Sequence, residues 1–555
     1  MNKKVCSFPI LFALLTLLIG TCAVVFPASA QAAPTSTGSI TVSGTVASSY
    51  DAYQIFSANV VDGDSDAKIA TDLAWASDAA RDAVLPVLHS AGMPNSQTTA
   101  QEAAEWLNTD SHLTSALSAQ LARSLQSSDS VSVALNAGKT AELPCGYWLI
   151  VADDDAIAQG EAGTAPIMAL VGGSAVTVKP KAATPKVAKH VLEDSTAAWQ
   201  KAADATVADD LYWRLAATVP AGLSAYDTYA VQFVDTMSAG LDPSKVAASM
   251  HVYVAAGTDG GFDAVSADKD GHAGTEPAKG WTDITAQCAT KVAADGTFTV
   301  RTGDLIAALG GADAFTAGAR VVAVYNAPLN SACNHGIAKG NPNEVYLRYP
   351  RSPFADQSGD AGFTRTPSDD ACAYTWDLAL TKRGSDGDKP LAGAVLSITD
   401  DRGRTLAADG TWDAEGKATV TTGEDGRVTV SGVDSGKLEV RELKAPKGYT
   451  AFEGTRSVTV KAEGLDVDQV AAAKPKLTIT AESPLRADNA DGTTGSLEAS
   501  LINTPTGTPP STITGGFMPS TGDMAMYAAA AAAVAGAALL VVALLIKRGG
   551  GSHSE

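Results

Sequence analysis

Lysine, acidic and asparagine side chains occupy strand positions where apolar residues are expected. Successive side chains of a strand point to opposite faces, so residues two apart share a face. By this rule Lys189, Asp235 and Asn343 each lie on the apolar side of a predicted strand. A buried ionisable group is costly unless it is paired. We therefore expect these three side chains to meet in one core, although Asn341 shares a face with Asn343 and leaves the choice of asparagine open.

A second set repeats the pattern closer to the C-terminus. Lys382 follows Trp376, Leu378 and Leu380 on one face of a predicted strand. Glu442 and Asn503 also follow apolar residues at a spacing of two, each on a strand of its own. The sequence therefore predicts a second buried set of Lys382, Glu442 and Asn503.

Such a set can form an amide crosslink. An apolar environment disfavours a charged lysine, and the neutral amine is a nucleophile. The same environment keeps a carboxyl group protonated, so that it can donate a hydrogen bond to the asparagine carbonyl and polarise it. Attack of the amine and loss of ammonia would join the two strands. The alternative is a buried, hydrogen-bonded set that never reacts.

Length and composition set the frame for these residues. Almost five hundred residues lie between two apolar ends, which is enough for about three domains. A net charge of −21 argues against nucleic-acid binding. No Ser/His/Asp, Cys/His or metal-ligand constellation indicates an enzyme, a cofactor or a metal site. Four cysteines lie outside the N-terminal apolar segment, and the sequence does not assign disulfide bonds among them: Cys145, Cys288, Cys333 and Cys372.

Both ends carry targeting signals. Lys3 and Lys4, an apolar stretch and a small-residue site at Ala28–Ala30 predict a signal peptide over residues 1–30, with lipidation at Cys22 as the weaker alternative. At the other end, an uncharged run over Met524–Ile546 is long enough to span a bilayer. A pentapeptide precedes this run, and two basic residues follow it. The pentapeptide consists of Met518, Pro519, Ser520, Thr521 and Gly522.

The signals and internal motifs together resemble one family. The pentapeptide with its apolar helix and basic tail resembles the Gram-positive cell-wall sorting signal Leu-Pro-x-Thr-Gly, with Met518 in place of Leu. Tyr50–Phe56 resembles the N-terminal domain of shaft pilins. The run from Glu442 to Tyr449, with Pro390–Ala394, resembles a Cna protein B-type domain, and Glu442 matches the pilin E-box glutamate. The chain thus resembles the major shaft subunit of a sortase-assembled pilus.

This resemblance implies a mainly β chain of three tandem domains. The first is expected to be α+β with mostly strands, and the other two to be immunoglobulin-like β-sandwiches. A C-terminal transmembrane sorting helix would follow them. The expected boundaries are residues 31–180, 181–366 and 367–508, with linker, sorting motif, helix and basic tail over 509–555.

The resemblance also assigns partners and an assembly. A pilin-specific sortase would cleave after Thr521 and join it to Lys181 of the next subunit, because Lys181 follows a Val-x-Val strand like the pilin-motif lysine, with Lys179 in place of the motif tyrosine. Implied partners are a wall-anchoring sortase, identical subunits, accessory tip and base pilins, and peptidoglycan, but no nucleic acid. The implied location is a surface pilus anchored to the cell wall, with a role in adhesion and colonisation. The alternative is a wall-anchored monomeric adhesin that does not polymerise.

Overall fold

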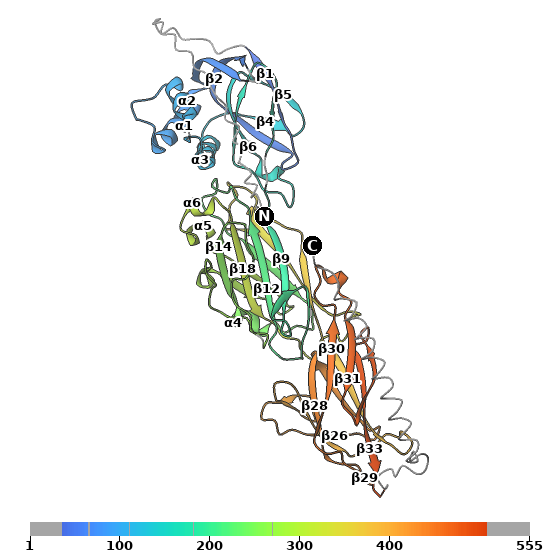
Figure 1. Cartoon of the computed structure of the whole chain (residues 1–555). Coiled ribbons are helices and arrows are strands. Elements are labelled where there is room, and N and C mark those ends of the chain that lie inside the picture. Colours follow the sequence, from blue (N-terminus) through green and yellow to red (C-terminus); the bar gives the residue numbers. More distant parts are fainter. Residues whose placement is uncertain (1–35, 65–66, 110, 181–182, 269, 508–555) are drawn as a thin grey trace, which may run out of the picture.

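Three domains follow one another in chain order along an elongated molecule (Figure 1). The structure is a computed structural model that describes residues 36–64, 67–109, 111–180, 183–268 and 270–507. The expected mainly β chain of three domains is confirmed. The expected sorting helix lies outside the described residues, and within these no helix is long and apolar enough to cross a membrane.

The first domain has two sheets and three helices. The smaller sheet, ordered β5-β1-β8, contains β1 (Thr37–Val42), β5 (Thr140–Pro144) and β8 (Val176–Val178). The larger sheet contains β2 (Ser49–Asp62), β3 (Lys68–Trp75), β4 (Ser132–Asn136), β6 (Gly146–Ala152) and β7 (Ile167–Val171). The helices are α1 (Asp78–Ser90), α2 (Ala100–Asn108) and α3 (Ser115–Gln126). They lie to one side of the sheets (Figure 1).

Local side-chain caps explain where these helices begin. Ser77 and Thr114 accept hydrogen bonds from the first-turn amides of α1 and α3, and Thr99 forms a capping box with Glu102 at the start of α2. Apolar residues at three- and four-residue spacing predict helices over Ala74–Leu85, with Pro86 as the stop, and over Ala100–Leu121. The end at Pro86 is wrong, because α1 continues to Ser90. Val84 and Leu88 are buried on its inner face, and their packing outweighs the loss of one backbone hydrogen bond at the proline.

The second domain is a sandwich of two sheets that share one large core. One sheet contains, in order, β10 (Ala198–Gln200), β9 (Lys186–Glu193), β12 (Tyr212–Val219), β18 (Ala319–Asn326), β14 (His251–Ala256) and β15 (Thr282–Asp283). The other contains β11 (Ala202–Asp204), β21 (Asp369–Tyr374), β19 (Asn341–Pro350), β13 (Gln232–Met237), β17 (Thr297–Arg301) and β16 (Ala289–Val292), with β20 (Phe363–Arg365) also paired to β19. Its α-helices have four residues each: α4 (Val246–Ser249), α5 (Leu305–Ala308) and α6 (Ala312–Phe315).

The third domain is a smaller sandwich. Its first sheet contains β27 (Arg427–Val433), β22 (Trp376–Gly384), β33 (Ser496–Pro505), β29 (Tyr449–Thr450) and β32 (Leu485–Asp491). The second contains β25 (Trp412–Asp413), β24 (Thr405–Leu406), β23 (Val395–Thr399), β28 (Gly436–Lys444), β30 (Thr455–Glu463), β31 (Lys476–Ala481) and β26 (Val420–Thr421). Because β21 still pairs in the second domain's sheet, the third domain's strands begin at Trp376, ten residues after the expected boundary at 366.

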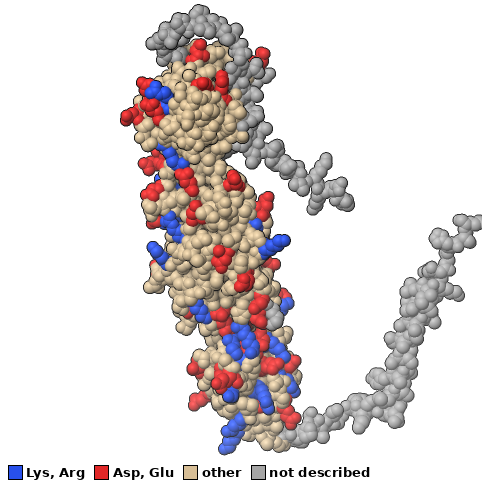
Figure 2. All heavy atoms as spheres, turned by 90° about the vertical axis from the view of Figure 1, so that its left-hand side faces the viewer, with Lys and Arg blue, Asp and Glu red and all other residues tan. Residues whose placement is uncertain are grey.

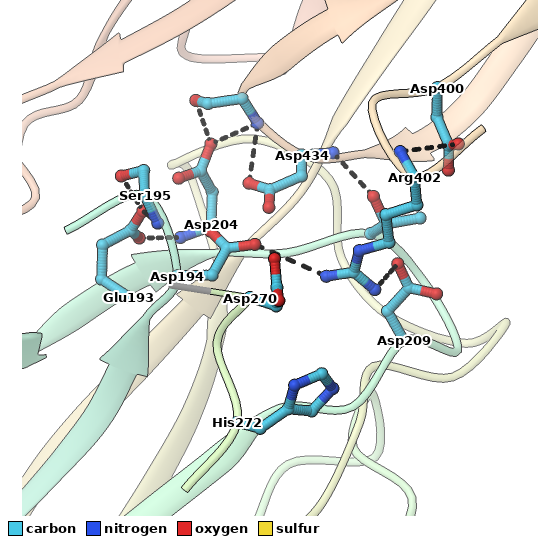
Figure 3. Close-up of polar contacts among 12 residues, drawn as sticks. Glu193, Asp194, Ser195, Asp204, Asp209, Asp270, His272, Asp400, Arg402 and Asp434 are labelled. Carbon is cyan, nitrogen blue, oxygen red and sulfur yellow. Dashed lines mark hydrogen bonds and ion pairs between the residues drawn. The ribbon is translucent and has the colours of Figure 1, made fainter. Parts of the chain in front are cut away.

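Charged side chains join the second and third domains. Asp204 of β11 accepts hydrogen bonds from the Trp376 indole at 2.6 Å and from the Ser435 amide at 3.0 Å. Asp209 pairs with Arg402 at 2.8 Å and with Arg404 at 2.5 Å. Figure 3 shows Asp204, Asp209 and Arg402 at the junction together with Glu193, Asp194 and Asp434. Elsewhere, Figure 2 shows acidic side chains scattered along the whole face that it presents.

Candidate functional site: two buried lysine–acid–asparagine sets

Lys189, Asp235 and Asn343 meet at the centre of the second domain. Lys189 comes from β9 in one sheet, whereas Asp235 and Asn343 come from β13 and β19, which are neighbours in the facing sheet. All three residues are fully buried, at 0% exposure. The alternation of buried residues along each strand therefore brings together the three side chains that the sequence selected.

A tyrosine that sequence reasoning missed connects this set. Lys189 donates to a carboxylate oxygen of Asp235 and also to the Tyr325 hydroxyl at 2.9 Å. Asn343 Nδ2 donates to the same hydroxyl at 2.9 Å, and the hydroxyl donates to Asp235 at 3.3 Å. Tyr325 thus holds the amine and the amide on one oxygen. The feature that points to Tyr325 is its buried place on β18, because a buried tyrosine hydroxyl normally has a hydrogen-bond partner.

Two further residues hold the backbone of Lys189 in place. The Lys189 amide donates to Asp369 at 2.7 Å, and its carbonyl accepts from Lys201 Nζ at 2.8 Å. Lys201 and Asp369 also pair with each other. This ion pair fixes the point on β9 from which the Lys189 side chain enters the core.

Burial shifts both ionisable groups of the set toward their neutral forms. Desolvation lowers the pKa of Lys189 from 10.5 to about 8, against the opposing attraction of Asp235. Desolvation also raises the pKa of Asp235 from 3.8 to about 6. The two pKa values therefore move toward each other, which lowers the free-energy cost of transferring a proton from the amine to the carboxylate.

The structure also distinguishes the two asparagines. Asn341 is engaged with backbone, since its Nδ2 donates to Asn334 O at 2.9 Å and its Oδ1 accepts from Asn334 N at 2.8 Å. By contrast, Asn343 Oδ1 and Asp235 Oδ1 are both buried without a hydrogen-bond partner among the described residues. Such orphan acceptors are costly. A proton on Asp235 would supply the donor that this set lacks.

The third domain holds its set between neighbouring strands. β22 and β33 are parallel, and Lys382 and Gly384 lie opposite Leu501 and Asn503 respectively. Glu442 reaches the pair from β28 in the facing sheet. Lys382 and Asn503 are 0% and 2% exposed. The side chains of Lys382 and Asn503 therefore meet between adjacent strands of one sheet, and Glu442 contacts them from the facing sheet.

The contacts of Glu442 differ from the expected ones in one respect. Asn503 Nδ2 donates to both carboxylate oxygens, at 2.8 and 3.0 Å, while Lys382 Nζ lies 3.0 Å from Oε1. Lys382 also donates to Asn503 Oδ1. Glu442 thus contacts the amide nitrogen, not the carbonyl oxygen, because the lysine already occupies the oxygen. Desolvation lowers the pKa of Lys382 to about 8, again against the attraction of the acid.

The intersubunit residues lie outside the described part of the chain. This holds for Lys181 and for the sorting pentapeptide with Thr521. The described residues just before Lys181 alternate as the sequence predicts, since Val178 is buried and Lys179 is exposed. The four cysteines Cys145, Cys288, Cys333 and Cys372 are all free thiols in the structure.

The fold and the two sets define a chain of consecutive β-rich domains, the last two of which each bury a lysine, an acid and an asparagine. Comparison with known proteins matches residues 377–474 to the family described as the SpaA prealbumin-like fold domain. Over 175 residues the chain is 29% identical to the trypsin-resistant surface T6 protein of Streptococcus pyogenes serotype M6. The aligned part spans 30% of this chain and only 30% of that protein.

Two solved structures with likeness over most of the chain are also pilins. The T6 backbone pilin of serotype M6 Streptococcus pyogenes has a TM-score of 0.45 and 17% identity, covering 85% of this chain and 98% of that chain. The major pilin SpaD of Corynebacterium diphtheriae has a TM-score of 0.40 and 16% identity, with the same coverage of both chains. Residues 377–474 of the third domain thus match the SpaA prealbumin-like fold domain, and a further part of the similarity is to a bacterial surface protein.

Proposed function

We propose that this protein is the structural subunit of a covalently polymerised cell-surface pilus, stiffened by one internal amide bond in each of its last two domains. The observation that carries the proposal is the pair of buried lysine–acid–asparagine sets, because unreacted buried charges on this scale would destabilise both cores. The match of residues 377–474 to the SpaA prealbumin-like fold domain supports the same assignment.

The internal bonds would form by transamidation. The neutral amine of Lys382 attacks Cγ of Asn503, a new C–N bond forms, and the bond from Cγ to Nδ2 breaks. The attacking nitrogen loses one proton and the leaving nitrogen gains one before it departs as ammonia, and Glu442, which contacts both nitrogens, is placed to carry this proton from one to the other. In the second domain Lys189, Asp235 and Asn343 would take the corresponding roles. Folding supplies the proximity that makes this reaction fast.

The intersubunit bond would be made by a sortase. Cleavage between Thr521 and Gly522 leaves the threonine carbonyl as a thioester on the enzyme, and the amine of Lys181 of the next subunit attacks it. A head-to-tail linkage of this kind is heterologous and does not close, so it gives a fibre. A wall-anchoring sortase would attach the fibre to peptidoglycan, with accessory pilins at its tip or base. The protein itself would be a substrate rather than an enzyme.

Intact-mass measurement tests the internal bonds. The parent protein should weigh two ammonia molecules less than its sequence, and peptide mapping should find Lys189 joined to Asn343 and Lys382 to Asn503. If the mass equals that of the sequence, both sets are only buried polar clusters and the crosslinking part of the proposal is wrong.

A denaturing gel of cell-wall extracts tests polymerisation. The parent should give a ladder, and Lys181→Arg should give a single monomer band, because arginine stays protonated and cannot act as the amine nucleophile. Lys186→Arg is the matched control, since Lys186 is an exposed lysine a few residues away, and its ladder should persist. A single band from the parent would instead support the monomeric adhesin.

A further inference from the structure

Arginines form a row across the outer face of one sheet in the second domain. Arg301 of β17 lies opposite Gln232 of β13, which lies opposite Arg348 of β19, which in turn lies opposite Arg365 of β20. Directly opposed residues share a face and approach closely, and like charges opposite each other are destabilising. Arg348 beside Arg365 is therefore an arrangement that folding stability alone does not explain.

Little negative charge offsets this row. Arg348 pairs with Asp360 at 2.8 Å, but Arg301 and Arg365 have no carboxylate within ion-pair distance among the described residues. Arg301 donates instead to the Gln357 backbone carbonyl. The whole chain has 61 acidic and 40 basic residues. In a chain with an excess of acidic residues, a cluster of incompletely neutralised arginines is unusual. An anion bound at this face would therefore be stabilised.

Aromatic rings fix the planes of these guanidinium groups. Arg365 lies over the Tyr346 ring at 5.0 Å, and Arg301 lies over the Phe363 ring at 4.7 Å. A guanidinium stacked on a ring keeps its N–H edge free and loses little further entropy when it binds. The N–H edge of the Arg365 guanidinium is therefore held in position to donate two hydrogen bonds to one oxyanion.

Two adjoining hollows lie beside the row. The first, of about 420 Å³, is lined by Arg348, Arg351 and Arg365 together with Gln159 from the first domain. The second, of about 400 Å³, shares Gln159, Tyr346 and Arg365 with the first. Both volumes fall within the range of small-molecule sites. The side chains of Gln159 and Arg365 make no hydrogen bond to other described residues, so their polar groups remain available to a ligand.

We propose that this face binds an acidic saccharide, whose carboxylate or sulfate group sits in the first hollow against Arg365 and Arg351. Guanidinium groups bind such oxyanions through two parallel hydrogen bonds. The second hollow is lined by Thr366, Ser368 and the exposed Glu344, so it would take the neutral hydroxyl-bearing part of the sugar and not a second anion. The proposal needs only the folded first and second domains, and it does not depend on polymerisation.

Binding measurements at physiological salt test the site. The probes are heparin, which carries sulfates, hyaluronan, which carries only carboxylates, and neutral dextran. The purified full chain should bind one or both polyanions but not dextran, and the one that binds identifies the oxyanion. Arg365→Glu and Arg351→Glu should each weaken binding roughly tenfold or more, the effect of losing one charge-assisted hydrogen-bonded pair. The melting temperature of each variant should stay close to that of the parent.

Matched variants separate a built site from general charge attraction. Arg441→Glu makes the same charge change at an exposed strand position in the third domain and should leave binding unchanged. Arg365→Lys keeps the charge but loses the planar fork, so it should also weaken binding. The proposal is overturned if neither polyanion binds, if Arg441→Glu weakens binding equally, or if Arg365→Lys binds as well as the parent. Equal competition by poly-glutamate would show that the site takes acidic peptides instead.

Discussion

At the scale of single residues, each of the two sets buries an amine beside an acid, and desolvation lowers the pKa of both lysines to about 8. The pKa values of Lys189 and Asp235 move toward each other because both charged forms are desolvated. Neither side chain is exposed, so water does not screen the pair. This environment makes the neutral amine accessible at neutral pH, where an exposed lysine is almost entirely protonated.

The acid of the third domain can be tested separately. Glu442→Ala should abolish the Lys382–Asn503 bond and leave the bond of the second domain intact, because Glu442 contacts both reacting side chains. After correction for the mass difference between Glu and Ala, the variant should weigh one ammonia molecule more than the parent. Glu439→Ala removes an exposed acid from the same strand and should leave the mass deficit unchanged. If Glu439→Ala also lacks the Lys382–Asn503 bond, then any change to β28 prevents the reaction and Glu442 has no special role.

Tyr325 gives a second test in the second domain. Tyr325→Phe removes the hydroxyl that binds both Lys189 and Asn343, so the bond should form roughly a hundredfold more slowly, the usual effect of losing one polar group at a reacting centre. A time course of ammonia loss on newly made protein measures this rate. Tyr253→Phe is the control, because Tyr253 is equally buried in the same sheet and, among the described residues, its hydroxyl donates to the Thr275 carbonyl alone. Equal rates in parent and Tyr325→Phe would show that the tyrosine is only structural.

The limits of sequence reasoning are clear at this scale. Lys382 and Glu442 could be selected because each breaks a run of alternating apolar residues on its own strand. Tyr325 and Lys201 could not, since a tyrosine fits the apolar pattern and the Lys201 partner, Asp369, is distant in sequence. Which contacts form between two sheets is decided by how the sandwich packs, and no single strand carries that information.

At the scale of elements, the two bonds would link different kinds of strand pair. The bond in the third domain would join β22 to β33, which are parallel neighbours in one sheet. The bond in the second domain would join β9 to β19 across the sandwich. A pull along the third domain would thus load the amide through adjacent strands. In the second domain, the amide would hold the two sheets together.

Removing the third-domain bond should lower its stability substantially. The Lys382–Asn503 link spans 121 residues, and closing a loop of that length stabilises by about 5 kcal/mol in the chain-entropy model. Asn503→Ala should therefore lower the melting temperature of the third domain by roughly 15–25 °C. Calorimetry measures this shift, and Asn489→Ala, an exposed change on neighbouring β32, should cause almost none. A shift of only a few degrees would mean that the parent carries no crosslink there.

The elements themselves were partly predictable. Strict alternation, as in β19, identified strands and their buried faces. The helical region of the first domain was predicted as two stretches, Ala74–Leu85 and Ala100–Leu121, but it folds as α1, α2 and α3. The second stretch is divided because Thr114 caps a new helix after α2 ends at Asn108. Short polar caps decide such breaks, and apolar periodicity does not reveal them.

At the scale of the whole molecule, the junction between the second and third domains concentrates acidic groups. Glu193 is 3% exposed, and its carboxylate accepts from the Asp204 amide at 3.2 Å and from Ser195. Asp194 pairs with Arg402 at 3.6 Å. Burial raises the pKa of Glu193 to about 8, with the negative charge of Asp204 as the second cause. Burial likewise raises the pKa of Asp434, from the other side of the junction, well above 3.8.

These shifts predict that the junction weakens as pH rises. A carboxyl group whose pKa is higher in the folded than in the unfolded state stabilises the fold fully below its unfolded pKa, and this stabilisation is lost as pH rises through the folded pKa. For Glu193 the window runs from 4.5 to about 8. Calorimetry should therefore show the melting temperature of the second and third domains falling as the pH rises from 4.5 to about 8. Glu193→Gln, which cannot ionise, should flatten this dependence, whereas Glu424→Gln at an exposed turn should not. If the melting temperature instead rises with pH in this range, the carboxyl groups at the junction are already ionised and paired, and the predicted loss of stability is wrong.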